Sequence, residues 1–322
     1  MNFARDVLAP LRHLTGRRLK ESRDARWEAE DLGLDGVRLT VTFPAAALST
    51  NLQKDLPAAP FFGLAFAYWH QRRTGRPTRF RAQVEGAVPD TAHARRARFV
   101  LHELASALPL RFEIDAKLQL PLPPGLTMNR AAAPRDTATR RGPLSEAALE
   151  RRIVGTPALL DDFVARIAPI TSFQRQLPLG LFEGPVAIGN EFFPRGAAQA
   201  DMWGTSPDGR VLHLFELKAR NNAHMGILPE ALVYARLLHH VRQRHIAGAG
   251  DGLEATRRAE RIIMWLVAPE YHPLVVADGD SPIRWINEGM ADDSVELRVL
   301  PFDLADDGAI KWRPEGVRSS LA

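Results

Sequence analysis

A proline-rich segment, residues 121–143, constrains the architecture of this chain more than any other feature of the sequence. Its letters, PLPPGLTMNRAAAPRDTATRRGP, combine prolines with small residues and show no hydrophobic periodicity, which is typical of a linker or a long loop. The chain has 322 residues, enough for two domains that each bury a core of their own. We therefore predict a first domain over residues 1–120, a linker over 121–143 and a second domain over 144–322.

The composition excludes several kinds of site. The chain contains no cysteine, so disulfides, thiolate zinc sites and cysteine nucleophiles are impossible, and a cytoplasmic location is favoured. Any metal must be bound by oxygen or imidazole, which favours hard cations. No apolar run is long enough to cross a bilayer, and the first 20 residues lack the apolar core of a signal peptide. We therefore expect no membrane partner and an ordinary first helix.

Positive charge is concentrated in arginine. The 42 basic residues are 5 lysines and 37 arginines, against 38 acidic residues, which gives a net charge of +4. The arginines form three clusters, at residues 72–81, 95–98 and 135–152. A local basic patch attracts a polyanion such as a nucleic acid, but a solvated basic surface is the simpler explanation of any single cluster. The charge pattern alone therefore indicates nucleic-acid binding only weakly.

The first domain alternates strand patterns with helical patterns. Residues 37–43, VRLTVTF, have the β-branched alternation of a strand, and residues 110–120 are also strand-like. Residues 61–73 show an apolar helical face, and residues 91–108 form a clear amphipathic pattern. We predict an α+β domain of a type that the sequence does not identify.

The second domain shows a more informative order of elements. A Pro-Asp-Gly turn at residues 206–210 joins two strand patterns into a hairpin. The predicted elements are helices at 144–154 (capped by Ser145) and 157–167, strands at 185–193, 198–206 and 211–219, a helix at 226–245, and strands at 261–269 and 295–302. The order helix, three strands, helix, strand predicts an α/β domain, whose sheet the last strand extends.

Two carboxylates and a lysine meet on the predicted hairpin. Asp201 lies on its first strand, and Glu216, Leu217 and Lys218 lie on its second. Residues two apart on a strand face the same side, so Glu216 and Lys218 project together, while Leu217 points into the core. Neighbouring carboxylates repel each other unless a cation such as Mg²⁺ or Mn²⁺ neutralises them, and a lysine can orient a water or stabilise phosphoryl charge. These residues suit metal-assisted hydrolysis of a phosphodiester.

In this order of elements, the stretch from Asp201 to Lys218 resembles the PD-(D/E)XK nuclease superfamily, which includes many restriction and repair endonucleases. The resemblance covers about residues 144–302. It implies a restriction-endonuclease-like fold, with a central mixed sheet flanked by helices, and Mg²⁺- or Mn²⁺-dependent cleavage of DNA. It also implies Asp201 and Glu216 as metal ligands, completed by the Leu217 carbonyl, with Lys218 positioning the attacking water.

The resemblance extends to the flanking helices. Superfamily members carry a glutamate on the helix before the first strand; Glu146 fits that position best, and Glu150, one turn later on the same face, is the alternative. Many members also carry a glutamine before an aromatic residue on the following helix. Here Glu230 stands four residues before Tyr234, so its role in the site is open. The stretch RQLPLGLF, residues 175–182, resembles part of a branch that the sequence does not name.

A second acid-x-lysine triplet tests how specific this pattern is. Asp115-Ala116-Lys117 also falls on a predicted strand, but no acid-bearing hairpin precedes it, and the proline-rich segment follows where a helix should be. Lysine is scarce in this chain, and a buried lysine without a purpose is costly, which favours a functional Lys218. The alternative is a salt-bridged Glu216–Lys218 pair at a sheet edge.

Other candidate sites have less support. His224, His239, His240 and His245 lack an acid at metal-ligand spacing, so we interpret them as surface or core histidines. Trp203 is interpreted as packing rather than as a platform for stacking bases. Asn221 and Asn222 form a turn or reach a backbone phosphate.

The resulting hypothesis is a two-domain DNA endonuclease that acts in restriction, anti-phage defence or repair. Its first domain would supply recognition, dimerisation or a regulatory input. One alternative is a catalytically inactive nucleic-acid-binding or scaffold protein with the same fold, and another is a metal-dependent hydrolase of small phosphoesters. The sequence leaves open whether the chain forms a homodimer and whether a partner protein or second messenger activates it.

Overall fold

The chain divides into two compact units. The computed structural model describes residues 1–11, 25–52, 54, 56–128, 144–187, 189–194, 199–219, 224–277 and 279–314. The first unit comprises Met1–Leu122, His224–Glu230 and His272–Gly289, and the second comprises Pro123–Ala223, Ala231–Tyr271 and Met290–Ala322. The first unit thus takes in two short segments from the half of the sequence that is predicted to form only the second domain.

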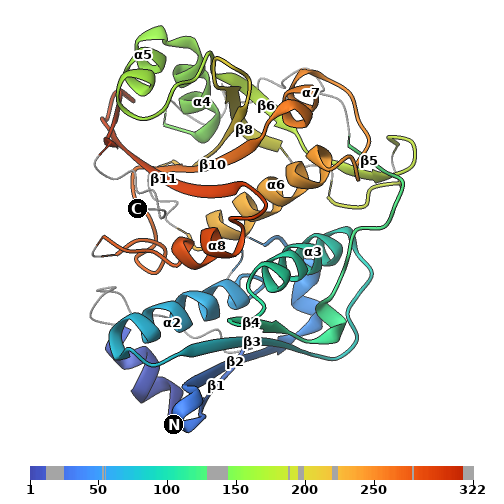
Figure 1. Ribbon diagram of the computed structural model, residues 1–322, viewed down its shortest axis with the longest axis vertical. Coiled ribbons are helices and arrows are strands. Elements are labelled where there is room, and N and C mark those ends of the chain that lie inside the picture. The colour runs from blue at the N-terminus through green and yellow to red at the C-terminus, as the bar shows by residue number, and fades with distance from the viewer. Residues whose placement is uncertain are drawn as a thin grey trace. The chain divides into compact units, whose positions relative to one another are not determined.

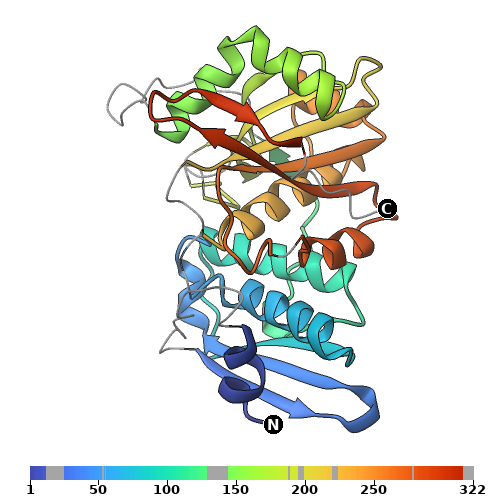
Figure 2. The same cartoon turned by 90° about the vertical axis from the view of Figure 1, so that its left-hand side faces the viewer.

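The first unit is built on a four-stranded sheet. Its strands are, in order across the sheet, β1 (Arg26–Asp31), β2 (Val37–Pro44), β3 (Thr78–Glu85) and β4 (Phe112–Ile114). β1 and β2 are antiparallel, whereas β2, β3 and β4 are parallel, so α2 (Ala59–Thr74) and α3 (Ala92–Ala107) each cross over between parallel strands. Figures 1 and 2 show both helices on one face of this sheet. The βαβαβ order is an α/β arrangement, whereas the sequence pattern predicts α+β, because strand direction is not visible in hydrophobic alternation.

Local signals set the ends of these elements. Thr91 caps α3, where its side chain accepts a hydrogen bond from the N–H of Ala94 at 3.2 Å, and α2 ends at Gly75, whose φ is 70°. Shorter helical turns are η1 (Phe3–Leu8), η2 (Gly33–Asp35), η3 (Ala45–Ser49), η4 (Ala116–Leu118) and α8 (Ile283–Gly289). The predicted first helix is therefore seen as η1 and its extension to Leu11, and its remainder lies outside the described residues.

The Asp115-Ala116-Lys117 triplet does not lie on a strand, so that prediction is wrong. β4 ends at Ile114, and the triplet enters the 3-10 turn η4. The Asp115 side chain stabilises the turn, because its Oδ1 accepts a hydrogen bond from the N–H of Lys117 at 3.0 Å. A carboxylate that caps its own turn breaks the extended chain at that point.

The second unit contains a mixed six-stranded sheet and a two-stranded ribbon. The order across the sheet is β12 (Ile310–Trp312), β11 (Val295–Leu304), β10 (Arg261–Ala268), β9 (Val211–Leu217), β8 (Gln199–Thr205) and β6 (Gln174–Pro178). β9, β10 and β11 are parallel, and the other pairs are antiparallel. β5 (Leu126–Met128) and β7 (Leu181–Glu183) form the ribbon. The α/β class is therefore confirmed.

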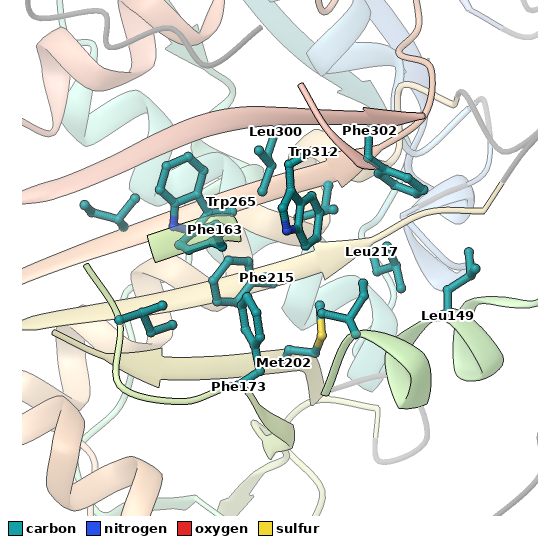
Figure 3. Packing of buried hydrophobic residues seen from close by; sticks show 14 of the residues in the cluster. Leu149, Phe163, Phe173, Met202, Phe215, Leu217, Trp265, Leu300, Phe302 and Trp312 are labelled. Atoms are coloured by element: carbon teal, nitrogen blue, oxygen red, sulfur yellow. The ribbon is translucent and has the colours of Figure 1, made fainter. Parts of the chain in front are cut away.

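Helices cover both faces of the six-stranded sheet. In Figures 1 and 2, α4 (Glu146–Gly155) and α5 (Pro157–Arg166) lie on one face, and α6 (Ile227–Arg242) lies on the other. α7 (Asp251–Arg258) follows α6 in the chain. The α4–α5 face closes over an aromatic core that includes Phe163, Phe215, Trp265 and Trp312 (Figure 3). No helix in the described part of the chain is long and apolar enough to cross a membrane.

Two predictions in the region before β8 need correction. The strand predicted at residues 185–193 is wrong, since the described residues there form only an isolated bridge between Glu191 and Phe182. Gly184 and Gly189 adopt left-handed φ values of 72° and 93°, which turn the chain out of an extended path. The edge strand next to β8 is instead β6. Of the predicted linker, residues 129–143 lie outside the described residues, while residues 126–128 form β5.

Candidate active site

In the β8–β9 hairpin, Asp201 lies just beyond the last paired residues of the two strands. The turn is the predicted one: the Ser206 hydroxyl donates to Asp208 at 2.6 Å, and Gly209 has a φ of 72°. The ladder runs to the pair Met202–Phe215, so Asp201 and Glu216 occupy the next opposing position. There Oδ2 of Asp201 accepts a hydrogen bond from the N–H of Leu217 at 2.7 Å. The carboxylate takes the place of a backbone acceptor, and the backbone of β9 fixes its orientation.

Glu216 and Lys218 form an ion pair at the end of β9. Nζ of Lys218 lies 2.6 Å from Oε1 of Glu216. The two residues are only 3% and 6% exposed, respectively, so the pair is held away from bulk water. The N–H of Lys218 donates to the carbonyl of Val267 on β10 at 2.8 Å, which anchors the end of the strand in the sheet. The backbone that carries both charged side chains is therefore held by β10.

Leu217 points to the opposite side from its neighbours, as its alternation predicts. Its side chain is fully buried in the core under α4 and α5, in the same cluster as Leu149 of α4 (Figure 3). This anchoring leaves the alternate side chains of Glu216 and Lys218 to the other side of the sheet. The hydrophobic core and the Glu216–Lys218 pair thus use opposite faces of one strand.

The pKa of the Asp201 carboxyl depends on the charges of Lys218 and of the two acids of α4. Burial is the largest influence on Asp201 and raises the pKa of its carboxyl. The positive charge of Lys218 and the Leu217 N–H act against this rise, whereas the negative charges of Glu150 and Glu146 add to it. Lys218, Glu146 and Glu150 therefore lie close enough to Asp201 to influence its carboxyl. The structure brings together the residues that the sequence singles out.

The two acids of α4 differ in their surroundings. Ser145 caps the helix, with its hydroxyl accepting from the N–H of Ala148 at 3.3 Å, and this places Glu146 in the first turn, where it is half-buried. Glu150 is 3% exposed, and its Oε1 accepts a hydrogen bond from Nε of Arg175 at 2.9 Å. Burial raises the pKa of Glu150, although its bond to Arg175 and the influence of the Gln176 side chain oppose that rise.

Gln176 is a residue that the motif analysis does not identify. It lies on β6, next to Arg175, and its side chain acts to lower the pKa of Glu150. Its φ is 52°, a left-handed value that is uncommon for any residue other than glycine. The only sequence signal was the stretch of residues 175–182, which contains it.

The donor set of this cluster fits a hard divalent cation. The Asp201 and Glu216 carboxylates and the Leu217 carbonyl are oxygen ligands, which Mg²⁺ and Mn²⁺ prefer. Mg²⁺ is commonly held by one or two carboxylates and keeps several waters. Among the described residues, no three histidine or acidic side chains form a ready-made metal cage. Water would therefore have to complete the coordination of any ion that binds here.

Other candidate residues have separate surroundings. Glu230 is buried and pairs with Arg96 at 3.8 Å. His239 faces Asp293 at 3.6 Å, and burial lowers its pKa, while His240 and His245 approach each other at 3.3 Å. Trp203 is buried, which supports its interpretation as packing. Asn221 and Asn222 lie outside the described residues, and His224 is exposed.

Several clustered arginines pair with neighbouring acids. Arg76 contacts Asp31 at 2.5 Å, Arg95 contacts Asp90 at 2.7 Å, and Arg72 contacts Asp280 at 2.7 Å. The part of the third cluster at residues 135–141 lies outside the described residues. For the arginines of the first unit, the local positive field is therefore reduced by acids, which favours the simpler interpretation of a solvated surface.

Comparisons with known proteins add no relative. No family model matches the chain, and neither the curated proteins nor the solved structures yield a match. The chemistry of the cluster therefore rests on its own residues and geometry.

Proposed function

We propose that this chain is a metal-dependent nuclease of the PD-(D/E)XK type, with DNA as its substrate. The observation that carries the proposal is the meeting of the Asp201 carboxylate with the Glu216–Lys218 pair where β8 and β9 separate. The order of elements supports a restriction-endonuclease-like fold, because an antiparallel hairpin is followed by α6 and by the parallel strand β10. Restriction, anti-phage defence and repair are the corresponding settings.

Each residue of the cluster has a role that follows from its contacts. Asp201 and Glu216, with the Leu217 carbonyl, would hold Mg²⁺ or Mn²⁺, and the ion would activate water and neutralise phosphoryl charge when bound. The N–H of Leu217 keeps the Asp201 carboxylate oriented. Lys218, held by Glu216 in a nearly buried position, would orient the attacking water and stabilise negative charge on the phosphate. Glu146 would support the metal or that water.

One observation favours a second candidate function. The Glu216–Lys218 pair is already a short ion pair, as a purely structural pair would be. A catalytically inactive nucleic-acid-binding or scaffold protein would keep such a pair for stability alone. Calorimetric titration with Mg²⁺ separates the two: binding that is lost in Asp201→Ala supports the nuclease, and absence of binding in the native chain supports the scaffold.

The direct test compares two lysine variants on plasmid, linear and single-stranded DNA with Mg²⁺ or Mn²⁺. Lys218→Ala should reduce cleavage at least about 100-fold, since a positioned proton-transfer or charge-stabilising group contributes at least that much. Lys117→Ala, in the other acid-x-lysine triplet, is the matched control and should cut like the native chain. Cleavage that survives in Lys218→Ala would overturn the assignment. Activity on nucleotides but not on polymers would instead indicate a hydrolase of small phosphoesters.

A further inference from the structure

α6 ends in a left-handed turn that brings two histidines together. The helix runs to Arg242, and Arg244 has a φ of 62°, the backbone conformation at which many helices stop. The N–H of His245 donates to the carbonyl of His240 at 2.9 Å, and the N–H of Arg244 donates to the carbonyl of Val241 at 3.0 Å. These two bonds form a Schellman motif, in which an apolar contact commonly joins the residues at the positions of His240 and His245. Here both residues are imidazoles.

The two rings face each other at a separation that suits one metal ion. Nδ1 of His240 lies 3.3 Å from Nδ1 of His245, and the ring centroids are 5.6 Å apart. A tetrahedral Zn²⁺ ion, with bonds to imidazole nitrogen of about 2.0–2.1 Å, holds two such nitrogens about 3.4 Å apart. Rotation of each ring about its broad second side-chain torsion can direct both lone pairs at one ion. The backbone does not need to move.

The chain is anchored on both sides of this histidine pair. α6 precedes it, and Ile246 directly after it is only 2% exposed. The N–H of Ala247 donates to the carbonyl of Leu126 on β5 at 2.9 Å, and its carbonyl accepts from the N–H of Met128 at 2.7 Å. His245 itself is exposed and His240 is half-buried, so solvent ions reach the pair. The spacing of the two rings is therefore set before any ion binds.

The neighbouring histidine does not join the pair. The His239 ring lies 5.9 Å from that of His240, but its Nε2 faces Asp293 at 3.6 Å and its Nδ1 lies 3.1 Å from a guanidinium nitrogen of Arg242. In the part of the chain that the structure describes, no three histidine or acidic side chains gather around one point. Two imidazoles therefore supply the protein ligands, and water fills the other positions. The carbonyl end of α6 also favours a positive ion.

We propose that His240 and His245 form a second metal site, which binds a borderline divalent cation such as Zn²⁺. Imidazole suits Zn²⁺, Ni²⁺ and Cu²⁺, whereas the oxygen ligands at Asp201 and Glu216 suit Mg²⁺ and Mn²⁺. In the bound form, each Nδ1 gives its lone pair to the ion and each ring carries its proton on Nε2. The inference does not depend on the proposed nuclease function. With two protein ligands at the surface, the ion exchanges with solvent and is not needed for folding.

Calorimetric titration with Zn²⁺ in an excess of Mg²⁺ tests the site. The native chain should bind one Zn²⁺ through this pair, and His240→Asn and His245→Asn should each lower that affinity at least about 10-fold, since loss of a residue that merely supports a ligand already costs that much. His224→Asn, at an exposed histidine of the first unit, is the matched control and should keep native affinity. Asp201→Ala should also keep it, which separates this site from the oxygen ligands.

Two substitutions of Arg244 test the geometry while both histidines remain. Arg244→Gly keeps the left-handed turn without strain and should keep native Zn²⁺ affinity. Arg244→Val also removes the arginine, but a β-branched residue is disfavoured in that conformation, so the rings should separate and the affinity should fall. Circular dichroism checks that each variant is folded. Equal affinities of Arg244→Gly and Arg244→Val, native affinity in His245→Asn, or failure of the native chain to bind Zn²⁺ each overturns the inference and leaves the proposed nuclease function standing.

Discussion

The chain contains two acid-x-lysine triplets, and their surroundings could hardly differ more. Glu216-Leu217-Lys218 ends a central strand, with both charged residues nearly buried and the leucine anchored in the core. Asp115-Ala116-Lys117 enters the 3-10 turn η4: the half-buried Asp115 caps the turn, and the exposed Lys117 lies 3.4 Å from the carbonyl of Gly86. An acid and a lysine two residues apart are thus held at the end of a sheet strand in one place and form part of a turn in the other.

Burial is what turns the first triplet into a candidate site. A charge pair removed from water is sensitive to the loss of either partner, and its field acts strongly on a nearby carboxylate such as Asp201. An exposed acid and an exposed lysine are screened by solvent and contribute little. If substitutions in the two triplets had equal effects on stability or activity, burial would not explain the difference between them.

The largest expected difference is in stability. Glu216→Gln removes the carboxylate that lies 2.6 Å from the nearly buried Lys218 and should lower the free energy of unfolding by about 3 kcal/mol. Asp115→Asn keeps a side chain that caps a turn equally well and should change it by less than about 0.5 kcal/mol. Urea unfolding monitored by circular dichroism measures both. Equal effects would mean that the Glu216–Lys218 pair is as solvated as the exposed triplet.

A second prediction tests the effect of burial on another titratable residue of β9, His213. His213 lies on the same strand; burial, helped by Arg298 and Arg261, lowers its pKa to about 4. Its Nδ1 accepts a hydrogen bond from the Trp265 indole at 3.1 Å, which requires the neutral ring. The unfolded chain takes up a proton below pH 6.5 and the folded chain does not, so this contribution to stability is present above pH 6.5 and is lost as the pH falls towards 4.

The expected loss for His213 between pH 7 and pH 5 is about 2 kcal/mol of unfolding free energy. His213→Asn keeps an acceptor for Trp265 and removes the titrating ring, so the acid-induced loss should shrink by that amount. Parallel urea titrations of the native chain and the variant at both pH values isolate the contribution, since every other group is shared. An identical pH dependence in the two proteins would contradict the assigned cause.

Much of the second unit follows from short-range signals in the sequence. The Pro-Asp-Gly turn and the alternation on its two sides predict the β8–β9 hairpin, and with it the placement of Asp201 near Glu216 and Lys218. The error at residues 185–193 arose because an apolar run resembles a strand even where left-handed glycines turn the chain. Gln176 could not be found in this way, because a left-handed backbone within a strand leaves no mark in the hydrophobic alternation.

The first unit shows a limit of a different kind. Its helices and strands are visible as patterns, but the parallel pairing of β2, β3 and β4 depends on contacts between distant segments. The return of residues 272–289 to this unit is equally nonlocal. Trp69 illustrates the reason, since its indole donates to the carbonyl of Leu274, more than 200 residues later, at 3.0 Å. No local periodicity encodes such a contact.

The smallest predicted effect on stability concerns the two acids of α4. Like the two triplets, they differ in how deeply they are buried. Glu150 is buried against Arg175, whereas Glu146 is half-buried in the first turn. Glu150→Gln should lower the free energy of unfolding by about 1.5 kcal/mol, since a charge-assisted hydrogen bond is lost and Arg175 remains partly solvated. Glu146→Gln should change it by less than about 0.5 kcal/mol. Thermal and urea unfolding of the two variants measure both effects. A larger loss of unfolding free energy in Glu146→Gln than in Glu150→Gln would assign the structural role to Glu146 and leave Glu150 as the acid that supports the metal.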